Sequence, residues 1–99
     1  MKKKFPSYVM LAGRKYKIKQ GKGLVYHGQP CLGLCDNQSR IIYIEKDQTD
    51  ISKRETLLHE CVHAFMNLTG IDQKLGEGEA EIYCQLFTVF FHDMEAALK

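Results

Sequence analysis

Residues 57–65 read Leu-Leu-His-Glu-Cys-Val-His-Ala-Phe, a His-Glu-x-x-His pattern inside an apolar frame. Two histidines four positions apart on an α-helix lie about 40° apart around the axis and roughly 6 Å apart along it, so both imidazoles can reach one ion. Glu60 would project beside the open side of such an ion, where a carboxylate can take a proton from water. The pattern therefore predicts a metal site formed by His59 and His63, with Glu60 as general base.

The helix that carries this pattern has sequence signals at both ends. Ser52–Glu55 reads as a capping box, and Gly70 suits the left-handed turn that ends a helix. Apolar side chains fall on both sides of the helix, namely Leu58, Val62, Phe65 and Met66 beside the histidines and Leu57, Cys61, Ala64 and Leu68 on the back. We therefore expect this helix to be packed between a sheet and the last helix.

The first half of the chain reads as short strands joined by turns. The expected strands are Tyr8–Ala12 with Lys15–Lys19 as one hairpin, Leu24–Tyr26 before a turn at residues 28–30, and Cys31–Cys35 with Arg40–Glu45 as a second hairpin. We predict one α+β domain over residues 1–99, with a small antiparallel sheet packed on the metal-bearing helix and a C-terminal helix.

The third metal ligand is expected from the acidic start of the last helix. On a helical wheel, Glu79 falls on the same side as an apolar stripe that includes Ile82, Leu86 and Phe90, so it should face inward. Glu81 lies nearly opposite and should face water. Two glycines beside Glu77 leave the direction of that residue open. The wheel thus predicts Glu79 as the ligand, with Glu77 and Glu81 as alternatives.

Charge and hydropathy argue against several partners and locations. The chain carries 14 Lys+Arg against 12 Asp+Glu, and a net charge of +2 is too small to indicate nucleic-acid binding. The dense basic run Lys2–Lys4 is expected to be a solvated terminus. Neither Tyr8–Ala12 nor Tyr83–Phe91 suits a signal-peptide core or a membrane span. We expect a soluble cytoplasmic protein with no nucleic-acid or membrane partner.

The cysteines and the C-terminal aromatic residues are expected to serve packing. Four cysteines without a secretory signal, Cys31, Cys35, Cys61 and Cys84, indicate reduced thiols, and their spacing disfavours a cysteine metal site. The three phenylalanines Phe87, Phe90 and Phe91 are expected in the core, with dimerisation or docking to a larger protein as the alternative.

These motifs resemble small gluzincin-like zinc metallopeptidases, many of them encoded by phages and prophages and distantly related to the ImmA/IrrE-type peptidases. The resemblance rests on the hairpin around Gly13–Tyr16, a strand containing Gly33, the strand Ile41–Ile44, the helix start Arg54–Glu60 and the segment Gly78–Tyr83. It implies a minimal zincin-like fold in which two histidines and a glutamate of the later helix bind zinc. Two imidazoles and a carboxylate suit zinc, although manganese, iron and nickel remain open by ligand type.

The resemblance also implies a reaction, namely hydrolysis of a peptide bond in a peptide or protein substrate. Glu60 would take a proton from a metal-activated water and deliver it to the leaving amine. The strand Ile41–Glu45 would be the edge along which an extended substrate lies. The donor to the oxyanion is left open among four residues, Tyr83, Tyr43, His27 and His92, of which the two histidines otherwise read as surface residues.

Two other classes of function remain open from the sequence. In the first, the same ligands and a fourth protein side chain, such as Cys61, Cys84 or another glutamate, close a structural zinc site that stabilises a small non-catalytic binding or regulatory module. In the second, the chain is a small regulator that acts on a transcription factor through its basic N-terminal run.

Overall fold

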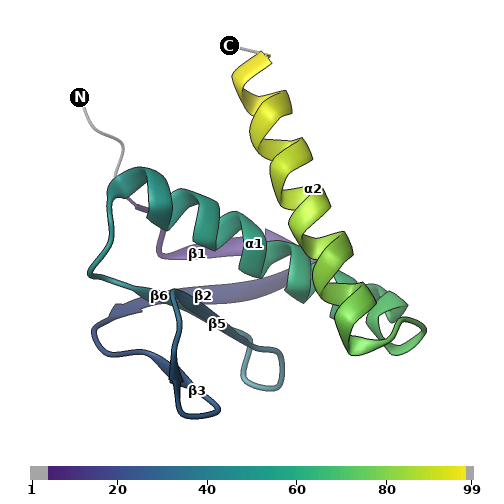
Figure 1. Cartoon of the computed structure of the whole chain (residues 1–99), viewed down its shortest axis with the longest axis horizontal. Helices are drawn as coiled ribbons and strands as arrows, with labels where there is room; N and C mark the ends of the chain where they lie inside the picture. The colour runs from purple at the N-terminus through teal and green to yellow at the C-terminus, as the bar shows by residue number, and fades with distance from the viewer. Residues whose placement is uncertain (1–4, 98–99) are drawn as a thin grey trace.

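The computed structural model describes residues 5–97, without the side chains of residues 72, 77 and 95–97, so the run Lys2–Lys4 lies outside the described residues. The elements are β1 (Tyr8–Leu11), β2 (Arg14–Gly21), β3 (Val25–Tyr26), β4 (Gln29–Pro30), β5 (Gly33–Asp36), β6 (Ile41–Glu45), α1 (Asp50–Thr69), the short 3-10 helix η1 (Ile71–Gln73) and α2 (Glu77–Ala97). Strands fill the first half and helices the second, as an α+β fold requires (Figure 1). Over the described part of the chain, neither long helix has the run of apolar residues needed to cross a membrane.

The main sheet has four strands in the spatial order β1, β2, β6, β5. β1 pairs antiparallel with β2, and β5 with β6, so both expected hairpins are confirmed. β2 and β6 run parallel, however, with Ile18 opposite Ile42, and the expectation of a wholly antiparallel sheet is wrong. The strand of the second hairpin that pairs with β2 is β6, whose Ile42 and Ile44 are fully buried. Because β6 runs parallel to β2, the sheet is mixed.

The segment between β2 and β5 folds back on itself as a separate two-stranded arm formed by β3 and β4. Its turn is His27-Gly28, with φ of 52° and 77°, one residue earlier than expected. Two left-handed residues make a tight turn whose twist matches that of the flanking strands. Glu45 at the end of β6 holds the base of the arm, because its Oε1 accepts the amide N–H groups of Gly23 and Leu24 at 2.8 and 3.1 Å.

Helix α1 begins two residues before the predicted capping box. The N-cap is Thr49, whose hydroxyl accepts the amide N–H of Ser52 at 3.1 Å. Ser52 therefore lies inside the first turn, and its own hydroxyl donates to the side chain of Gln48. The predicted end is confirmed, since Gly70 has a φ of 78° and its amide N–H bonds to the carbonyl of Asn67.

Helix α1 lies between the sheet and α2, as its two apolar sides predict (Figure 1). The buried residues that join the sheet to α1 are Tyr16, Ile18, Ile42, Ile44 and Ala64. A smaller buried group, Val62, Met66 and Cys84, joins α1 to α2. The helix that carries the two histidines is therefore fixed on both sides, which holds their side chains in a defined place.

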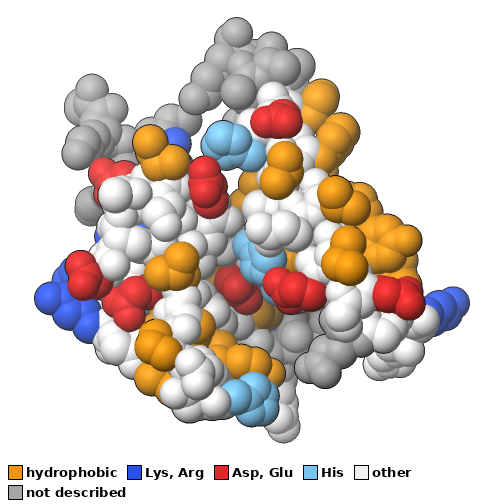
Figure 2. Space-filling model, in the orientation of Figure 1, with side chains coloured by type: hydrophobic (Ala, Val, Ile, Leu, Met, Phe, Trp, Pro, Cys, Tyr) orange, Lys and Arg blue, Asp and Glu red, His pale blue; other side chains and the backbone are white. Residues whose placement is uncertain are grey.

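Helix α2 turns toward the protein the side opposite to the one predicted. Ile82, Leu86 and Phe90 are 61%, 60% and 54% exposed, so the apolar stripe faces away from α1. Hydrophobic side chains gather along this outer side of α2 in Figure 2. The side toward α1 carries small residues four positions apart, namely Ala80, Cys84 and Thr88, of which the last two are buried. Small side chains let two helix backbones approach closely, so this row forms the contact and the bulky residues point outward.

Candidate metal centre and cleft

The two histidines meet as the sequence predicts. His59 and His63 lie one turn apart on α1, and their Nε2 atoms are 3.2 Å apart. Their side chains are 20% and 30% exposed, so both imidazoles are mostly shielded from solvent. Such a pair supplies two nitrogen donors directed at one point.

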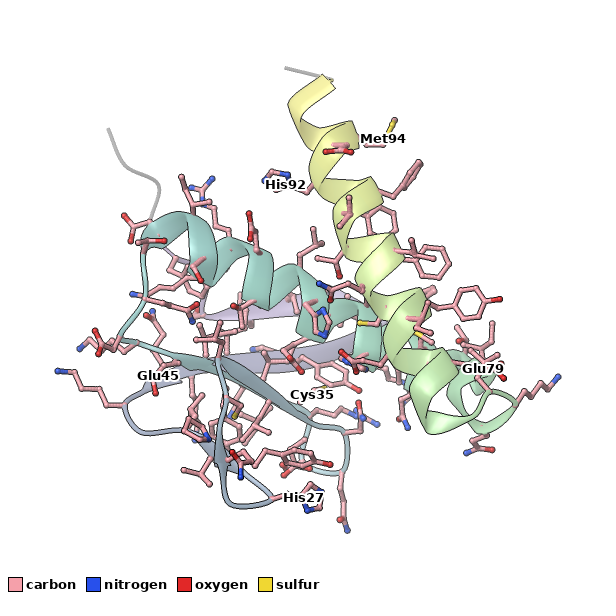
Figure 3. All side chains as sticks on the ribbon, viewed as in Figure 1. His27, Cys35, Glu45, Glu79, His92 and Met94 are labelled. Carbon is pink, nitrogen blue, oxygen red and sulfur yellow. The ribbon has the colours of Figure 1, made fainter. Side chains whose placement is uncertain are left out.

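The third group at this point is Glu81, the alternative that the wheel placed toward water. Its Oε1 lies 3.0 Å from Nε2 of His59, and its Oε2 lies 3.1 Å from Nε2 of His63. Glu79 is exposed and lies on the outer side of α2, away from α1 (Figure 3). The inward orientation expected for Glu79 is therefore wrong, and Glu81 replaces it as the candidate ligand. The side chain of Glu77 lies outside the described residues.

The three contacts at this centre cannot all be hydrogen bonds. Each Nε2 atom carries at most one hydrogen, and a carboxylate carries none. If both imidazoles donate to Glu81, the two N–H groups of His59 and His63 face each other across 3.2 Å. A cation between the three groups would instead receive one lone pair from each. Bonds of about 2.0–2.1 Å to a tetrahedral ion would separate the donor atoms by about 3.3 Å, close to the observed distances.

Cys84 is a further donor, which the sequence analysis named only as a possible fourth ligand of a structural zinc site. Its Sγ and the ring nitrogens of His59 and His63 all lie within 4.8 Å of one another. The thiol is fully buried, donates to the carbonyl oxygen of His59 at 3.2 Å, and has its pKa raised to about 12 by burial. The sequence could have indicated this donor, because Cys84 follows Glu81 by three residues and the two side chains therefore leave the same side of α2. Cys31, Cys35, Cys61 and Cys84 are all free thiols, as expected.

Glu60 is buried beside the centre. Its side chain is 9% exposed, and burial raises its pKa from 4.5 to about 7, with the negative charge of Glu81 as a second cause. Gly33 on β5 lies directly over it. A Cβ at Gly33 would stand 3.0 Å from Cγ of Glu60 and 2.5 Å from Cγ2 of Thr56. Only a residue without a side chain lets β5 lie this close to α1.

A cleft of about 1050 Å³ contains the centre. Its floor is α1 with His59, Glu60 and His63, one wall is β5, and the other wall is the side of α2 that carries Glu81. Figure 2 shows histidine and carboxylate side chains gathered in the hollow beside α2. Its lining includes hydrophobic residues of the arm and of β5 as well as these polar groups, which is the usual make-up of a ligand site.

The strand that borders the cleft is β5, so the expectation that Ile41–Glu45 forms the sheet edge is wrong. β6 is interior and β5 is the edge strand. The amide N–H of Glu45 bonds to the carbonyl of Leu32 at 2.8 Å, and Leu34 is opposite Tyr43. Bonding pairs alternate along an antiparallel ladder, so the backbone groups of residues 33 and 35 point away from β6, toward the free edge.

Of the four residues considered as oxyanion donors, His92 alone lines the cleft. It projects from α2 toward α1 (Figure 3), and its Nε2 lies 3.8 Å from Oε1 of Glu55. Tyr83 is 45% exposed and does not line the cleft, and His27 is at the exposed tip of the arm (Figure 3). Tyr43 alternates with the buried Ile42 and Ile44, so it faces the side of the sheet opposite α1.

A scan against protein-family models, a search of curated proteins and a search of solved structures each returned no match to this chain.

Proposed function

We propose that this chain is a divalent-metal-dependent peptidase, with His59, His63 and Glu81 as metal ligands and Glu60 as general base. The observation that supports this best is the meeting of two imidazole nitrogens and one carboxylate at 3.0–3.2 Å, with a second carboxylate buried beside them. A minimal zincin-like arrangement and the resemblance to phage-type metallopeptidases belong to the same proposal.

The ion that suits these donors is zinc, because zinc accepts imidazole nitrogen and carboxylate oxygen in a tetrahedral shell. When bound there, it would polarise the scissile carbonyl and lower the pKa of a water in the fourth position. The protein supplies rigid placement of the ligands, since α1 is held by the sheet on one side and by α2 on the other.

Glu60 would accept a proton from the attacking water and pass it to the leaving amine. A general base works best when its pKa lies near the operating pH, and burial brings the pKa of Glu60 to about 7 in the metal-free protein. A cation held by its neighbours would lower that value and keep Glu60 ionised before the reaction. The open side of the centre faces the cleft, where substrate can reach it.

The substrate would lie extended along β5. The outward backbone groups of Cys35 and the carbonyl oxygen of Gly33 would provide a hydrogen-bond donor and acceptors for an added strand, whereas the amide N–H of Gly33 bonds to the side chain of Cys31. Gly33 also lies against Glu60, so a peptide paired with this edge would pass beside the general base. The chemical class that fits is therefore an unfolded or flexible polypeptide segment.

A Glu60→Gln variant tests the assignment. The variant is expected to bind one zinc as the unchanged protein does, yet to hydrolyse an unfolded protein substrate at least about 10²-fold more slowly. Glu79→Gln is the matched control, since Glu79 is exposed on the outer side of α2. Undiminished hydrolysis by Glu60→Gln would remove Glu60 from the chemistry, and failure of the unchanged protein to bind zinc would remove the metallopeptidase function.

A structural zinc module is the second candidate, and Cys84 is the observation that favours it. A thiol within 4.8 Å of both imidazoles could supply a fourth protein ligand and close the site. In that case zinc would raise the thermal stability of the protein, and no substrate would be hydrolysed by any variant. Activity of the zinc-loaded protein therefore separates the two candidates.

A further inference from the structure

Cys84 lies beside the proposed metal centre, and the proposed mechanism does not use it. Its side chain is fully buried, and its Sγ belongs to the same group of possible ligand atoms as His59 and His63. Cys84 follows Glu81 by three residues, so both side chains leave the same side of α2. The thiol and the carboxylate therefore approach the two imidazoles from one helix.

In the metal-free protein, Cys84 makes hydrogen bonds to both α1 and α2. Its S–H donates to the carbonyl oxygen of His59 at 3.2 Å, which ties it to the turn of α1 that carries both histidines. The buried hydroxyl of Thr88 donates to the backbone carbonyl of Cys84 at 2.7 Å. The thiol is thus held by two packed helices and not by a loop.

In the metal-free protein the thiol lies near the centre but outside bonding distance of an ion held by the other three groups. The three groups His59, His63 and Glu81 already lie 3.0–3.2 Å apart, whereas the set that includes Cys84 extends to 4.8 Å. Bonds of about 2.3 Å to sulfur and 2.0–2.1 Å to nitrogen would place those atoms about 3.6 Å apart. Sγ must therefore move by about 1 Å to bind the ion, at the cost of its bond to His59.

The other thiols have different surroundings. Cys61 packs toward the sheet core, and the Sγ of Cys35 donates to Oδ1 of Asn37 at 3.4 Å. Among the described residues, the histidine pair groups with Cys84 and with no other cysteine. Cys61, on the same helix as the histidines but directed away from them, therefore provides a matched control.

We propose that Cys84 is a reversible fourth protein ligand that closes the metal centre and holds the peptidase latent until substrate displaces it. This inference rests on the proposed function. With an ion held by His59, His63 and Glu81, closing would release the thiol proton to solvent and break its bond to His59, and the thiolate would take the fourth position in place of water. Opening would reverse this, since the thiolate would leave the ion and take a proton from solvent, and water or substrate would return.

Latency of this kind has a kinetic signature. A ligand in the protein that competes with substrate lowers the fraction of molecules able to bind, so it raises the apparent KM without changing kcat. Replacing Cys84 by serine should therefore lower KM, by a factor equal to one plus the ratio of closed to open centres, at unchanged kcat. Cys61→Ser should leave both constants unchanged.

Cobalt provides a direct test of sulfur ligation. The full chain is stripped of metal with a chelator and titrated with Co²⁺, whose visible d–d bands report binding and whose near-ultraviolet charge-transfer band reports a thiolate ligand. We expect the charge-transfer band in the unchanged protein and in Cys61→Ser, and its loss in Cys84→Ser with the d–d bands retained. Visible bands without the charge-transfer band in the unchanged protein would overturn the role of Cys84 and leave the proposed function standing. No cobalt or zinc binding at all would overturn both.

Zinc X-ray absorption gives a second test that needs no variant. The unchanged protein loaded with one zinc should show one sulfur neighbour at about 2.3 Å together with nitrogen or oxygen neighbours at about 2.0–2.1 Å. A shell of nitrogen and oxygen alone would contradict the proposal even if Cys84→Ser failed to fold.

Discussion

Gly33 of β5 lies directly against Glu60 of α1, so close that a Cβ at residue 33 would be 3.0 Å from Cγ and 3.3 Å from Oε2 of that glutamate. The same Cβ would be 2.5 Å from Cγ2 of Thr56. Gly33 does not have a positive φ, so its backbone conformation does not require glycine. The close approach of two elements requires it, and that approach joins the free sheet edge to the proposed general base.

A Gly33→Ala variant should therefore be destabilised by about 1–3 kcal/mol, because the added methyl group overpacks the contact between β5 and α1. Thr56→Ser removes the methyl group that is struck and keeps the hydroxyl that donates to Gln48 at 3.2 Å. The double variant should recover part of the loss, measured as the free energy of unfolding in urea. Equal losses with and without Thr56→Ser would show that the contact with Thr56 is not the cause.

Glu81→Gln should weaken zinc binding far more than Glu79→Gln. Glu81 has both carboxylate oxygens at 3.0 and 3.1 Å from the two imidazoles, whereas Glu79 is exposed on the other side of α2. Mutation of a residue that only hydrogen-bonds to a metal ligand typically lowers metal affinity 10–100-fold. Loss of Glu81 as a direct ligand should lower zinc affinity by at least this factor. Calorimetric titration of zinc into each variant measures this, and the reverse order of affinities would restore Glu79 as the ligand.

The metal-free protein should lose stability as the pH rises from about 4.5 to about 7. Burial raises the pKa of Glu60 from 4.5 to about 7 in the folded state. Below pH 4.5 the group is protonated in both states and has no effect; between 4.5 and 7 the unfolded state loses its proton first, so unfolding becomes more favourable. Above pH 7 the loss is complete, at about 3 kcal/mol.

Glu60→Gln supplies the control for this pH dependence, since an amide does not titrate. In the presence of a chelator, the variant should be more stable than the unchanged protein at pH 8 and about equal to it at pH 4. Thermal unfolding at both pH values measures the difference. A difference that is the same at pH 4 and pH 8 would mean that Glu60 is not desolvated in the folded state.

Local signals were sufficient to predict several parts of this fold. The spacing of His59 and His63 predicted their meeting on one helix turn, and Gly70 predicted the end of that helix. Both main hairpins followed from alternating residues around turn signals. The parallel pairing of β2 and β6 was not predictable in this way, because it depends on which strand of the second hairpin takes the interior position.

The third ligand could not be predicted from the helical wheel, because the wheel does not show which side of α2 contacts α1. The wheel identifies the apolar side of α2, and the prediction assumed that this side faces the protein. The observed contact uses the small residues Ala80, Cys84 and Thr88, which let α2 approach α1 closely. The resulting roll of the helix turns Glu81 toward the histidines and Glu79 away from them.

The outward roll of α2 gives a last prediction, that Leu86→Gln is nearly neutral for stability. Leu86 is 60% exposed, and glutamine forms helices about as well as leucine, so the free energy of unfolding should change by less than about 0.5 kcal/mol. Met66→Ala is the matched comparison, because Met66 is 4% exposed between α1 and α2 and its loss should cost about 2–5 kcal/mol. Urea unfolding at low protein concentration measures both variants. A cost for Leu86→Gln as large as that for Met66→Ala would mean that the apolar stripe of α2 is buried, and would reverse the roll that brings Glu81 to the metal centre.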